Sequence, residues 1–257
     1  MNKVYVIKIG GNLIDDPKEL AAFMKAFAAI KEPKILVHGG GKTATAMAKK
    51  MGLPVQMHQG RRITDKANLD IITMVFGGLI NKKLVAQLQA LHCDAIGMSG
   101  ADGNIIVASK RPPNPIDFGF VGDIRTVNGK GLVQLLNTNK VPVLCSITHN
   151  GKGQLLNTNA DTIAAQVAIA LVGNFEVYLR YCFEKAGVLE DLSDESSVIH
   201  RIDSEQYEIL KANKKIMGGM LPKLSNCFEA LQNGVKEVHV GGPNLLYGSE
   251  TLTQILL

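Results

Sequence analysis

Short apolar runs recur along the chain, and most are followed by a stretch with the periodicity of a helix. The first run, residues 4–9, has five apolar positions out of six and a single charge, Lys8. A run with almost no polar position predicts a strand that is covered on both faces, as in a parallel sheet. Comparable runs predict further strands at 35–37, 95–98, 105–108, 141–147, 177–179 and 235–240, with a weaker candidate at 55–64.

The segments between these runs carry helix signals. Asp16, Pro17 and Glu19 have the order of a helix start, with a cap, a first-turn proline and an acid three positions after the cap. Apolar residues then recur every three or four positions, which predicts a face packed on a sheet. Similar patterns predict helices at 44–51, 129–137, 160–172, 204–212 and 219–233. A long one is predicted at 65–91, interrupted by Gly77-Gly78, with apolar residues on more than one face, as in a buried helix or a subunit interface.

Strands and helices alternate almost throughout the chain. This alternation predicts an α/β fold, a three-layer αβα sandwich in which a central, mostly parallel sheet of about eight strands lies between two helical layers. The best lobe boundary is Gly173-Asn174, which divides the chain into residues 1–173 and 174–257.

Composition and charge narrow the functional class. The chain has 257 residues, 46% hydrophobic and 20% charged, which is enough to bury a full core. It begins with strand sequence instead of a basic and apolar leader, and no apolar segment reaches about 18 residues, so we expect a cytoplasmic protein without a membrane span. The net charge of +5 comes without a Lys/Arg run, so we expect small anionic ligands and no nucleic-acid partner.

The cysteines and histidines do not have the spacing of a metal site. The four cysteines are scattered in apolar neighbourhoods without a Cys-x-x-Cys pair, and the six histidines lack ligand spacing. We therefore expect neither disulfides nor a metal held by protein side chains.

Two of the predicted strands end in glycine-rich segments. Lys8 stands two residues before Gly10-Gly11, and the run at 35–37 leads into Gly39-Gly40-Gly41. Both segments would meet at the carboxyl edge of a parallel sheet, where backbone N–H groups and helix N-termini favour an anion. A buried lysine also needs an anionic partner, although an edge strand with a solvated lysine would give the same local sequence.

The second glycine segment fits no named nucleotide motif completely. A Walker A loop that ended at Lys42-Thr43 would need glycine where Leu36 stands. The spacing of Gly39, Gly41 and Ala44 fits a dinucleotide fingerprint, but Arg61-Arg62 stands where the ribose-binding acid is expected. Basic residues at that place favour a carboxylate or phosphate ligand.

Two further segments combine polar side chains with helix starts. Asn157, Asn159 and Asp161 stand at the beginning of an apolar helix, a pattern that fits simple N-capping as well as ligand binding. Gly218-Gly219 precedes a helix with Lys223 in its first turns, where a cation is unfavourable unless an acid or anion compensates it.

Taken together, these segments resemble the amino-acid kinase family. The similarity covers nearly the whole chain and consists of eight segments in the family's order, at residues 8–11, 37–41, 60–64, 81–82, 99–103, 119–122, 157–161 and 218–223. Within the family, the chain is most similar to the enzymes of arginine biosynthesis that phosphorylate the side-chain carboxylate of an N-acyl-L-glutamate.

The resemblance implies ATP as the phosphoryl donor, with Mg²⁺ held mainly by its phosphates, and no general base because the accepting carboxylate is already ionised. It assigns Lys8 to the transferring phosphoryl, Lys223 to the leaving ADP and Asp161 to orienting both lysines. The family's phosphate-binding glycines correspond to Gly10, Gly11, Gly40 and Gly41, and its substrate-binding positions to Gly39, Gly40, Arg62 and Asn157. Residues 1–173 would bind the acyl-amino acid and form the dimer, and residues 174–257 would bind the nucleotide.

Departures from the family pattern leave alternatives open. Residues 179–188 are longer than the family's nucleotide segment and lack its aspartate, which leaves nucleotide preference open and admits a nucleotide-binding regulator without catalysis. Residues 145–149 differ from the usual ending, so N-succinyl-L-glutamate competes with N-acetyl-L-glutamate as the substrate, and another amino acid is a further alternative. The family's N-terminal helix does not precede the first strand, so we expect a homodimer that arginine does not inhibit.

Overall fold

The computed structural model describes the whole chain except residues 59, 192, 214, 217, 249 and 250. Its centre is an eight-stranded sheet, called here the large sheet, in the order β12-β14-β13-β11-β1-β2-β8-β5. The strands are β1 Lys3–Ile9, β2 Lys34–His38, β5 Ala95–Met98, β8 Val141–Cys145, β11 Glu176–Cys182, β12 Arg201–Ile202, β13 Glu237–Gly241 and β14 Thr253–Ile255. Every neighbouring pair is parallel except β13 and β14, so the prediction of a mostly parallel sheet is confirmed.

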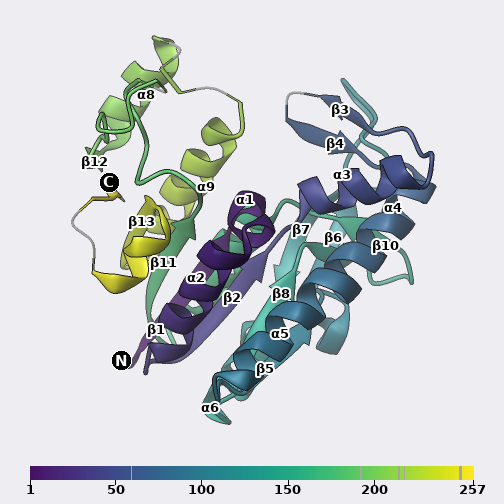
Figure 1. The fold of residues 1–257 in the computed structure, drawn as a ribbon, viewed down its shortest axis with the longest axis horizontal. Coiled ribbons are helices and arrows are strands. Elements are labelled where there is room, and N and C mark those ends of the chain that lie inside the picture. Colours follow the sequence, from purple (N-terminus) through teal and green to yellow (C-terminus); the bar gives the residue numbers. More distant parts are fainter. Residues whose placement is uncertain (59, 192, 214, 217, 249–250) are drawn as a thin grey trace.

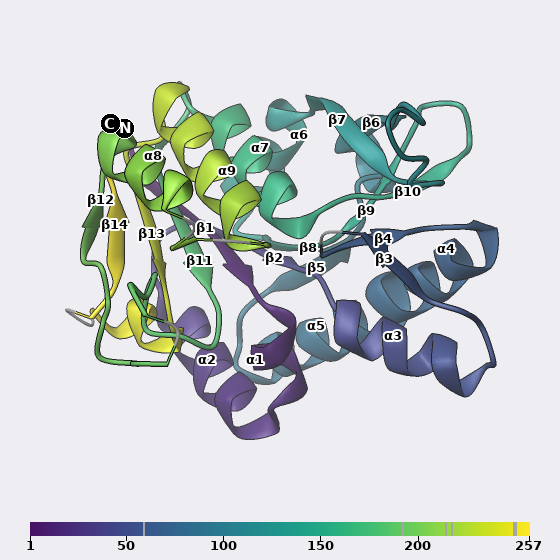
Figure 2. The ribbon, with the colours of Figure 1, turned by 90° about the horizontal axis from the view of Figure 1, so that it is seen from above.

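Helices cover both faces of the large sheet, as the alternating pattern predicts (Figure 2). One layer contains α6 Gly129–Asn137, α7 Ala160–Leu171, α8 Ser204–Ala212 and α9 Met220–Gln232. The other contains α1 Gly11–Asp15, α2 Pro17–Ala29, α3 Gly41–Lys50, α4 Lys66–Ile72 and α5 Asn81–Ala90. Two buried apolar clusters fill the space between the layers and the sheet, one against α7 and α9 and the other against α2 and α5.

Alternating residues of the central strand β1 enter the two clusters. Val4 and Val6 pack with α7 and α9, whereas Ile7 and Ile9 pack with α2. Lys8 is the next residue on the face of Val4 and Val6, because side chains alternate along a strand. The strand therefore points its one charged residue at the α7 and α9 layer, at the end where the glycines follow.

Local signals explain where α2 begins. The Asp16 carboxylate accepts hydrogen bonds from the backbone N–H groups of Lys18 and Glu19, and Pro17 occupies the first helical position. The predicted apolar stripe is buried, with Phe23 and Phe27 fully covered. The same stripe closes one face of β1 near the glycine turn.

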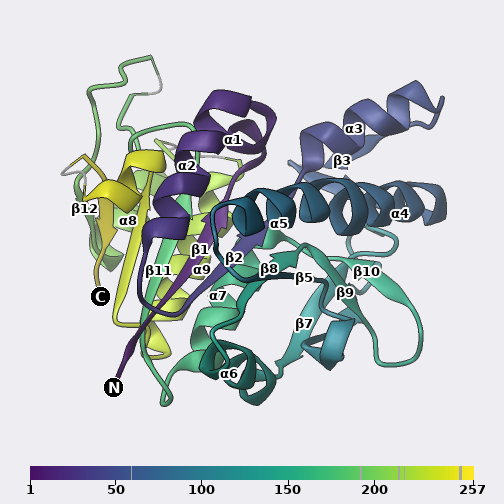
Figure 3. The ribbon, with the colours of Figure 1, turned by 60° about the horizontal axis from the view of Figure 1, so that its bottom comes forward.

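A smaller sheet and a hairpin depart from the sequence-based prediction. The run at 105–108 does not join the large sheet, because β6 Ile106–Lys110 belongs to a four-stranded sheet with β7 Gly122–Val127, β9 Ile147–His149 and β10 Leu155–Asn157. Figure 3 shows β7, β9 and β10 next to the β5 and β8 end of the large sheet. The weak candidate at 55–64 is an antiparallel hairpin, β3 Gln56–His58 and β4 Arg61–Ile63, which lies by α3 (Figure 1).

The long helix predicted at 65–91 is three consecutive segments. Between α4 and α5 lies η1 Thr73–Ile80, which has the i→i+5 hydrogen bonding of a π-helix and contains Gly77-Gly78. Two short 3₁₀ segments, η2 Asp102–Asn104 and η3 Pro243–Tyr247, complete the helices of the described residues. Within those residues, none of the helices has the length and apolarity needed to cross a bilayer.

Candidate active site

The two glycine segments meet at one edge of the large sheet. In the parallel register of β1 with β2 and β11, Lys8 lies opposite Val37 and Tyr181, so all three strands end there together. Gly10 turns the chain out of β1, and its N–H donates to the Cys182 carbonyl at 2.9 Å. Because that donor is already used, the free backbone N–H groups of this turn begin with Gly11, which opens α1.

Lys8, Asp161 and Lys223 form one buried cluster. Lys8 Nζ lies 2.8 Å from Asp161 Oδ1, and Lys223 Nζ donates to Asp161 Oδ2, also at 2.8 Å. The exposed fractions of the three side chains are 12%, 13% and 10% for Lys8, Asp161 and Lys223. The structure thus brings together three residues that are far apart in the sequence, from β1, α7 and α9.

The protonation states of this cluster follow from its charges. Burial alone would raise the pKa of the Asp161 carboxyl, but the charges of Lys223 and Lys8 outweigh burial and hold that pKa well below its usual range. Burial lowers the pKa of Lys8, and Asp161 opposes this shift while Lys223 adds to it. One carboxylate between two ammonium groups leaves a net positive charge at the sheet edge, which is suited to an anionic ligand.

The second glycine segment supports the opposite wall of the site. Gly40 has φ of +154°, a backbone conformation that strains any other residue, and a Cβ atom there would meet Ile80 Cδ1 at 2.2 Å and the Phe76 ring at 3.1 Å. Gly41 then opens the ten-residue helix α3, whose first backbone N–H groups carry the positive end of the helix dipole. Gly39 lies beside Ala160, the residue before Asp161.

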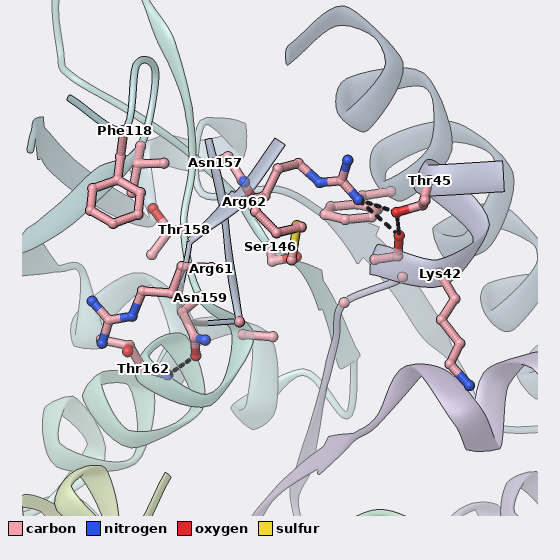
Figure 4. A pocket seen from close by; sticks show the side chains of 18 of the residues that line it. Lys42, Thr45, Arg61, Arg62, Phe118, Ser146, Asn157, Thr158, Asn159 and Thr162 are labelled. Atoms are coloured by element: carbon pink, nitrogen blue, oxygen red, sulfur yellow. Dashed lines mark hydrogen bonds between the residues drawn. The ribbon is translucent and has the colours of Figure 1, made fainter. Parts of the chain in front are cut away.

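Arg62 has a buried guanidinium in which one nitrogen is paired and another is not. Its Nη2 donates to the Gly41 carbonyl at 3.0 Å and to Thr45 Oγ1 at 2.5 Å (Figure 4). Its Nη1 is buried without a hydrogen-bond partner among the described residues. Burial lowers the pKa of Arg62, but an arginine stays charged at neutral pH. An arginine held on one side and unpaired on the other is arranged to receive a carboxylate.

A pocket of about 650 Å³ lies in front of Arg62. Figure 4 shows Asn157, Thr158 and Asn159 on the side of this pocket across from Thr45 and Lys42. The cations in its wall are Lys42, Lys49, Arg61, Arg62 and Arg111, and its described lining contains no aspartate or glutamate. Its apolar wall includes Met57, Phe76, Phe118 and Val121.

The pocket and the charged cluster are neighbours but separate. The wall of the pocket includes Gly39, Gly40, Gly41 and Ala160, and Asp161 follows directly. Asn157 lies in the wall as well, where its Nδ2 donates to Thr64 Oγ1 at 3.0 Å. The wall of the pocket therefore reaches the residue next to the charged cluster.

The structure adds a buried pair that sequence reasoning missed. Asn81 Nδ2 donates to His38 Nε2 at 3.1 Å and to the Val143 carbonyl at 2.9 Å, while His38 Nδ1 lies 2.9 Å from the Gly39 carbonyl. Burial lowers the pKa of His38 to about 4, so the ring is neutral and its Nδ1–H faces Gly39. Asn81 stands in one of the motifs of the resemblance, but nothing in the sequence links it to His38.

The described residues include no group of three or more His, Cys, Asp or Glu side chains arranged to hold a metal ion. In the charged cluster both Asp161 oxygens face ammonium groups. The site therefore fits a metal ion that is carried by phosphate oxygens and water rather than by protein carboxylates.

Comparison with known proteins gives consistent matches along the chain. Residues 3–242 match the amino acid kinase family. The acetylglutamate kinase of Cytophaga hutchinsonii is 54% identical over 239 residues, which is 93% of this chain and 90% of that protein. The acetylglutamate kinase of Methanopyrus kandleri is 36% identical over 97% of this chain and 99% of its own length.

Solved structures agree on the fold. The protein smu.665 of Streptococcus mutans superposes with a TM-score of 0.83 at 25% identity and covers 98% of both chains. The carbamate kinase of Giardia lamblia bound to AMP-PNP gives a TM-score of 0.71 at 15% identity over 99% of this chain and 98% of that one. At 15% identity, the similarity to the carbamate kinase shows a shared fold and nothing further.

Proposed function

Because the chain belongs to the amino-acid kinase family, we propose that it transfers the γ-phosphoryl group of ATP to the side-chain carboxylate of N-acetyl-L-glutamate, a step of arginine biosynthesis. The relatives named acetylglutamate kinase, which match over almost the full length, support the substrate. The single observation that carries the chemistry is Asp161 held between Lys8 and Lys223 at 2.8 Å on each side.

The reaction needs positioning and charge stabilisation rather than a base. An oxygen of the ionised side-chain carboxylate attacks the γ-phosphorus, and the bond from that phosphorus to the ADP oxygen breaks with its electron pair on ADP. The products are an acyl phosphate and ADP, with no proton transferred. Two anions must be held together, and a net positive cluster beside helix N-termini lowers that cost.

Each residue of the cluster has a separate role in this proposal. Lys8 stabilises the transferring phosphoryl, and Lys223 stabilises the charge that develops on ADP. Asp161 keeps both ammonium groups in place through its two oxygens. Backbone N–H groups of Gly11, Gly40 and Gly41 would add donors to the phosphoryl oxygens, with Gly10 providing the turn. Mg²⁺ would arrive on the phosphates of ATP and neutralise part of their charge.

Arg62 and Asn157 are the proposed receptors of the substrate's α-carboxylate and acyl-amino group. The unpaired Nη1 of Arg62 supports this role, because a bound carboxylate would satisfy it. Gly39 and Gly40 line the same pocket as Arg62 and would complete the substrate site. We assign acyl-amino acid binding to residues 1–173 and nucleotide binding to residues 174–257.

N-succinyl-L-glutamate is the second candidate substrate. A succinyl group adds a third carboxylate, and the pocket wall has five cations and no acid among its described residues. The altered segment at 145–149 contributes Ser146 to the same wall. The acyl groups therefore have to be compared directly.

A hydroxylamine trap tests the proposed function. With ATP and Mg²⁺, the protein should convert N-acetyl-L-glutamate to a product that hydroxylamine captures as a hydroxamate, and release ADP in equal amount. Free L-glutamate and L-aspartate are the controls, and N-succinyl-L-glutamate is assayed in parallel. A hydroxamate formed with aspartate but with neither acylated glutamate would refute the assignment, and no ADP release with any acid would favour a regulator without catalysis.

The same proposal includes a homodimer in the cytoplasm. Met74 and Leu79 on η1 are exposed apolar side chains, as an interface between subunits would require. All four cysteines are free thiols, which fits a reducing compartment. Light scattering on the purified protein tests the dimer, since a monomer in dilute solution would contradict it.

A further inference from the structure

Tyr181 lies beneath the charged cluster and has no role in the proposal above. It is fully buried in β11 and lies opposite Lys8 in the parallel register with β1. Leu179 and Val6 are the preceding partners on the same face, and both pack in the apolar cluster against α7 and α9. Tyr181 and Lys8 therefore project toward the same helical layer, where Asp161 and Lys223 also lie.

Two groups of Tyr181 contact the cluster. Its hydroxyl donates to the Asp161 backbone carbonyl at 2.9 Å. Its ring faces Lys223, whose Nζ lies 5.1 Å from the ring centroid. Burial raises the pKa of Tyr181 well above its ordinary value, so the hydroxyl remains a donor in every assay near neutral pH. One side chain thus touches two of the three charged residues through different atoms.

Lys223 needs a second support besides Asp161. It lies in the first turns of α9, where the helix dipole disfavours a cation, and it shares Asp161 with Lys8. The negative face of an aromatic ring attracts an ammonium group, and this attraction grows when water is excluded. The ring also limits the rotamers of a long flexible side chain.

Tyr178, on the same strand as Tyr181, makes similar contacts outside the charged cluster and therefore serves as a comparison. Its hydroxyl donates to Glu176 at 3.1 Å, and its ring centroid is 5.2 Å from Lys3 Nζ. It is three residues from Tyr181 and therefore points to the other face of the sheet. The two residues make the same kinds of contact, and only those of Tyr181 involve the charged cluster.

We propose that Tyr181 is a positioning residue that holds the Lys223 ammonium against its ring. In this position Lys223 would contact the ADP leaving group. The inference rests on the proposed phosphoryl transfer for the identity of that leaving group. Tyr181 lies in residues 179–188, where the chain departs from the family's nucleotide segment, and outside the eight segments that carry the resemblance. The hydroxyl has the smaller part, because it anchors the first turn of α7 and does not contact a lysine.

Paired substitutions separate the ring from the hydroxyl. Tyr181→Phe keeps the ring and removes the hydroxyl, whereas Tyr181→Met fills the core with an unbranched side chain that has no aromatic face. Tyr178→Phe and Tyr178→Met are the matched controls. Each protein is titrated with MgADP in a calorimeter, which gives the dissociation constant and, through the stoichiometry, the fraction of correctly folded sites. The kcat for N-acetyl-L-glutamate is then corrected by that fraction.

We expect Tyr181→Met to weaken MgADP binding about fivefold and to lower the corrected kcat about tenfold, the range of a partly desolvated cation–π contact. Tyr181→Phe should stay within about threefold of the wild type in both quantities, and the KM for the acyl-amino acid should change less than about twofold. A role confined to packing would lower the stoichiometry and leave the corrected values unchanged. Unchanged corrected values in Tyr181→Met would overturn the proposal. So would equal losses of MgADP affinity and kcat in Tyr178→Met, or losses in Tyr181→Phe as large as those in Tyr181→Met.

A second measurement covers the case in which Tyr181→Met does not fold. In Tyr181→Phe, labelled ring signals of residue 181 should shift when MgADP binds, because the charge of Lys223 is drawn toward the nucleotide. Unchanged ring signals at saturating MgADP would refute the contact as a functional one. The nucleotide readouts do not depend on the acceptor, so a wild type that binds MgADP but yields no acyl phosphate would refute the proposed function alone.

Discussion

Replacing Asp161 with asparagine tests whether one carboxylate holds the site together. Asparagine has nearly the same shape, but it removes the negative charge between Lys8 and Lys223. Its amide oxygen can accept a hydrogen bond from one lysine, and its NH₂ group would then face the other ammonium. One buried cation would be left without a partner.

The size of the expected loss in stability follows from the burial of the three charged side chains. All three side chains are less than 15% exposed, with both lysine nitrogens at 2.8 Å from the carboxylate. Removing one partner of a buried ion pair costs roughly 3 to 5 kcal/mol, and the amide oxygen of asparagine recovers part of it, so we expect a loss of about 3 kcal/mol in the free energy of unfolding at pH 7. Because both lysines lose their fixed positions, kcat should fall about 100-fold or more.

Urea denaturation at several pH values measures the loss in the free energy of unfolding. The pKa of Asp161 is depressed in the folded protein, so its stabilisation is complete above the unfolded value of about 3.9 and is lost as pH falls through the folded value. The difference in the free energy of unfolding between wild type and Asp161→Asn should therefore be constant near neutral pH and become smaller below about pH 4.

An exposed ion pair provides the control for this experiment. Asp94 and Lys140 lie 2.6 Å apart with exposed fractions of 54% and 42%, and Asp94→Asn should cost far less than Asp161→Asn. Equal free energies for wild type and Asp161→Asn at pH 7, or a gap that stays unchanged down to pH 3, would refute the charge argument.

Four further substitutions test single parts of the site. Lys8→Arg should lower kcat about 100-fold, since a planar fork cannot replace a compact ammonium at the phosphoryl; unchanged turnover would remove Lys8 from the mechanism. Arg62→Lys should raise the KM for N-acetyl-L-glutamate about tenfold in steady-state assays and change kcat less, whereas an unaltered KM would count against the carboxylate receptor. Asn81→Leu leaves His38 Nε2 and the Val143 carbonyl without a donor and should cost about 2 kcal/mol in urea denaturation, a figure that a stability equal to wild type would contradict. Gly40→Ala should lower kcat about tenfold or more while the far-UV spectrum stays native, because the positive φ strains alanine and the added Cβ crowds Ile80 and Phe76; normal turnover would show that the loop can shift freely.

The large sheet was predictable because most of its strands are runs of apolar residues in the sequence. The run at residues 4–9 is apolar at nearly every position, and β1 is indeed covered on both faces between two parallel neighbours. The run at 105–108 has the same character, yet β6 lies in the smaller sheet, since an apolar run reports burial and not the partner strand. The segment at 65–91 was predicted as a long helix with an interruption at Gly77-Gly78, and the π-helical segment η1 contains those two glycines; the type of helix was not predictable, because π-helical turns leave the apolar pattern intact.

The site was predictable only as far as local chemistry reveals it. Lys8, Asp161 and Lys223 each stand out because a charge beside glycines or at a helix start needs a reason, and the family resemblance placed all three in one site. Tyr181 and the pair of His38 and Asn81 were not singled out, because none of them carries a fixed charge beside glycines or at a helix start, and their burial cannot be read from the sequence. Their relation to the cluster depends on strand register and on contacts across 20 residues or more, such as the hydrogen bond from Tyr181 to the Asp161 carbonyl. The three charged residues of the cluster are thus visible from sequence, whereas a contact such as that of Tyr181 becomes visible only when the register of the sheet is known.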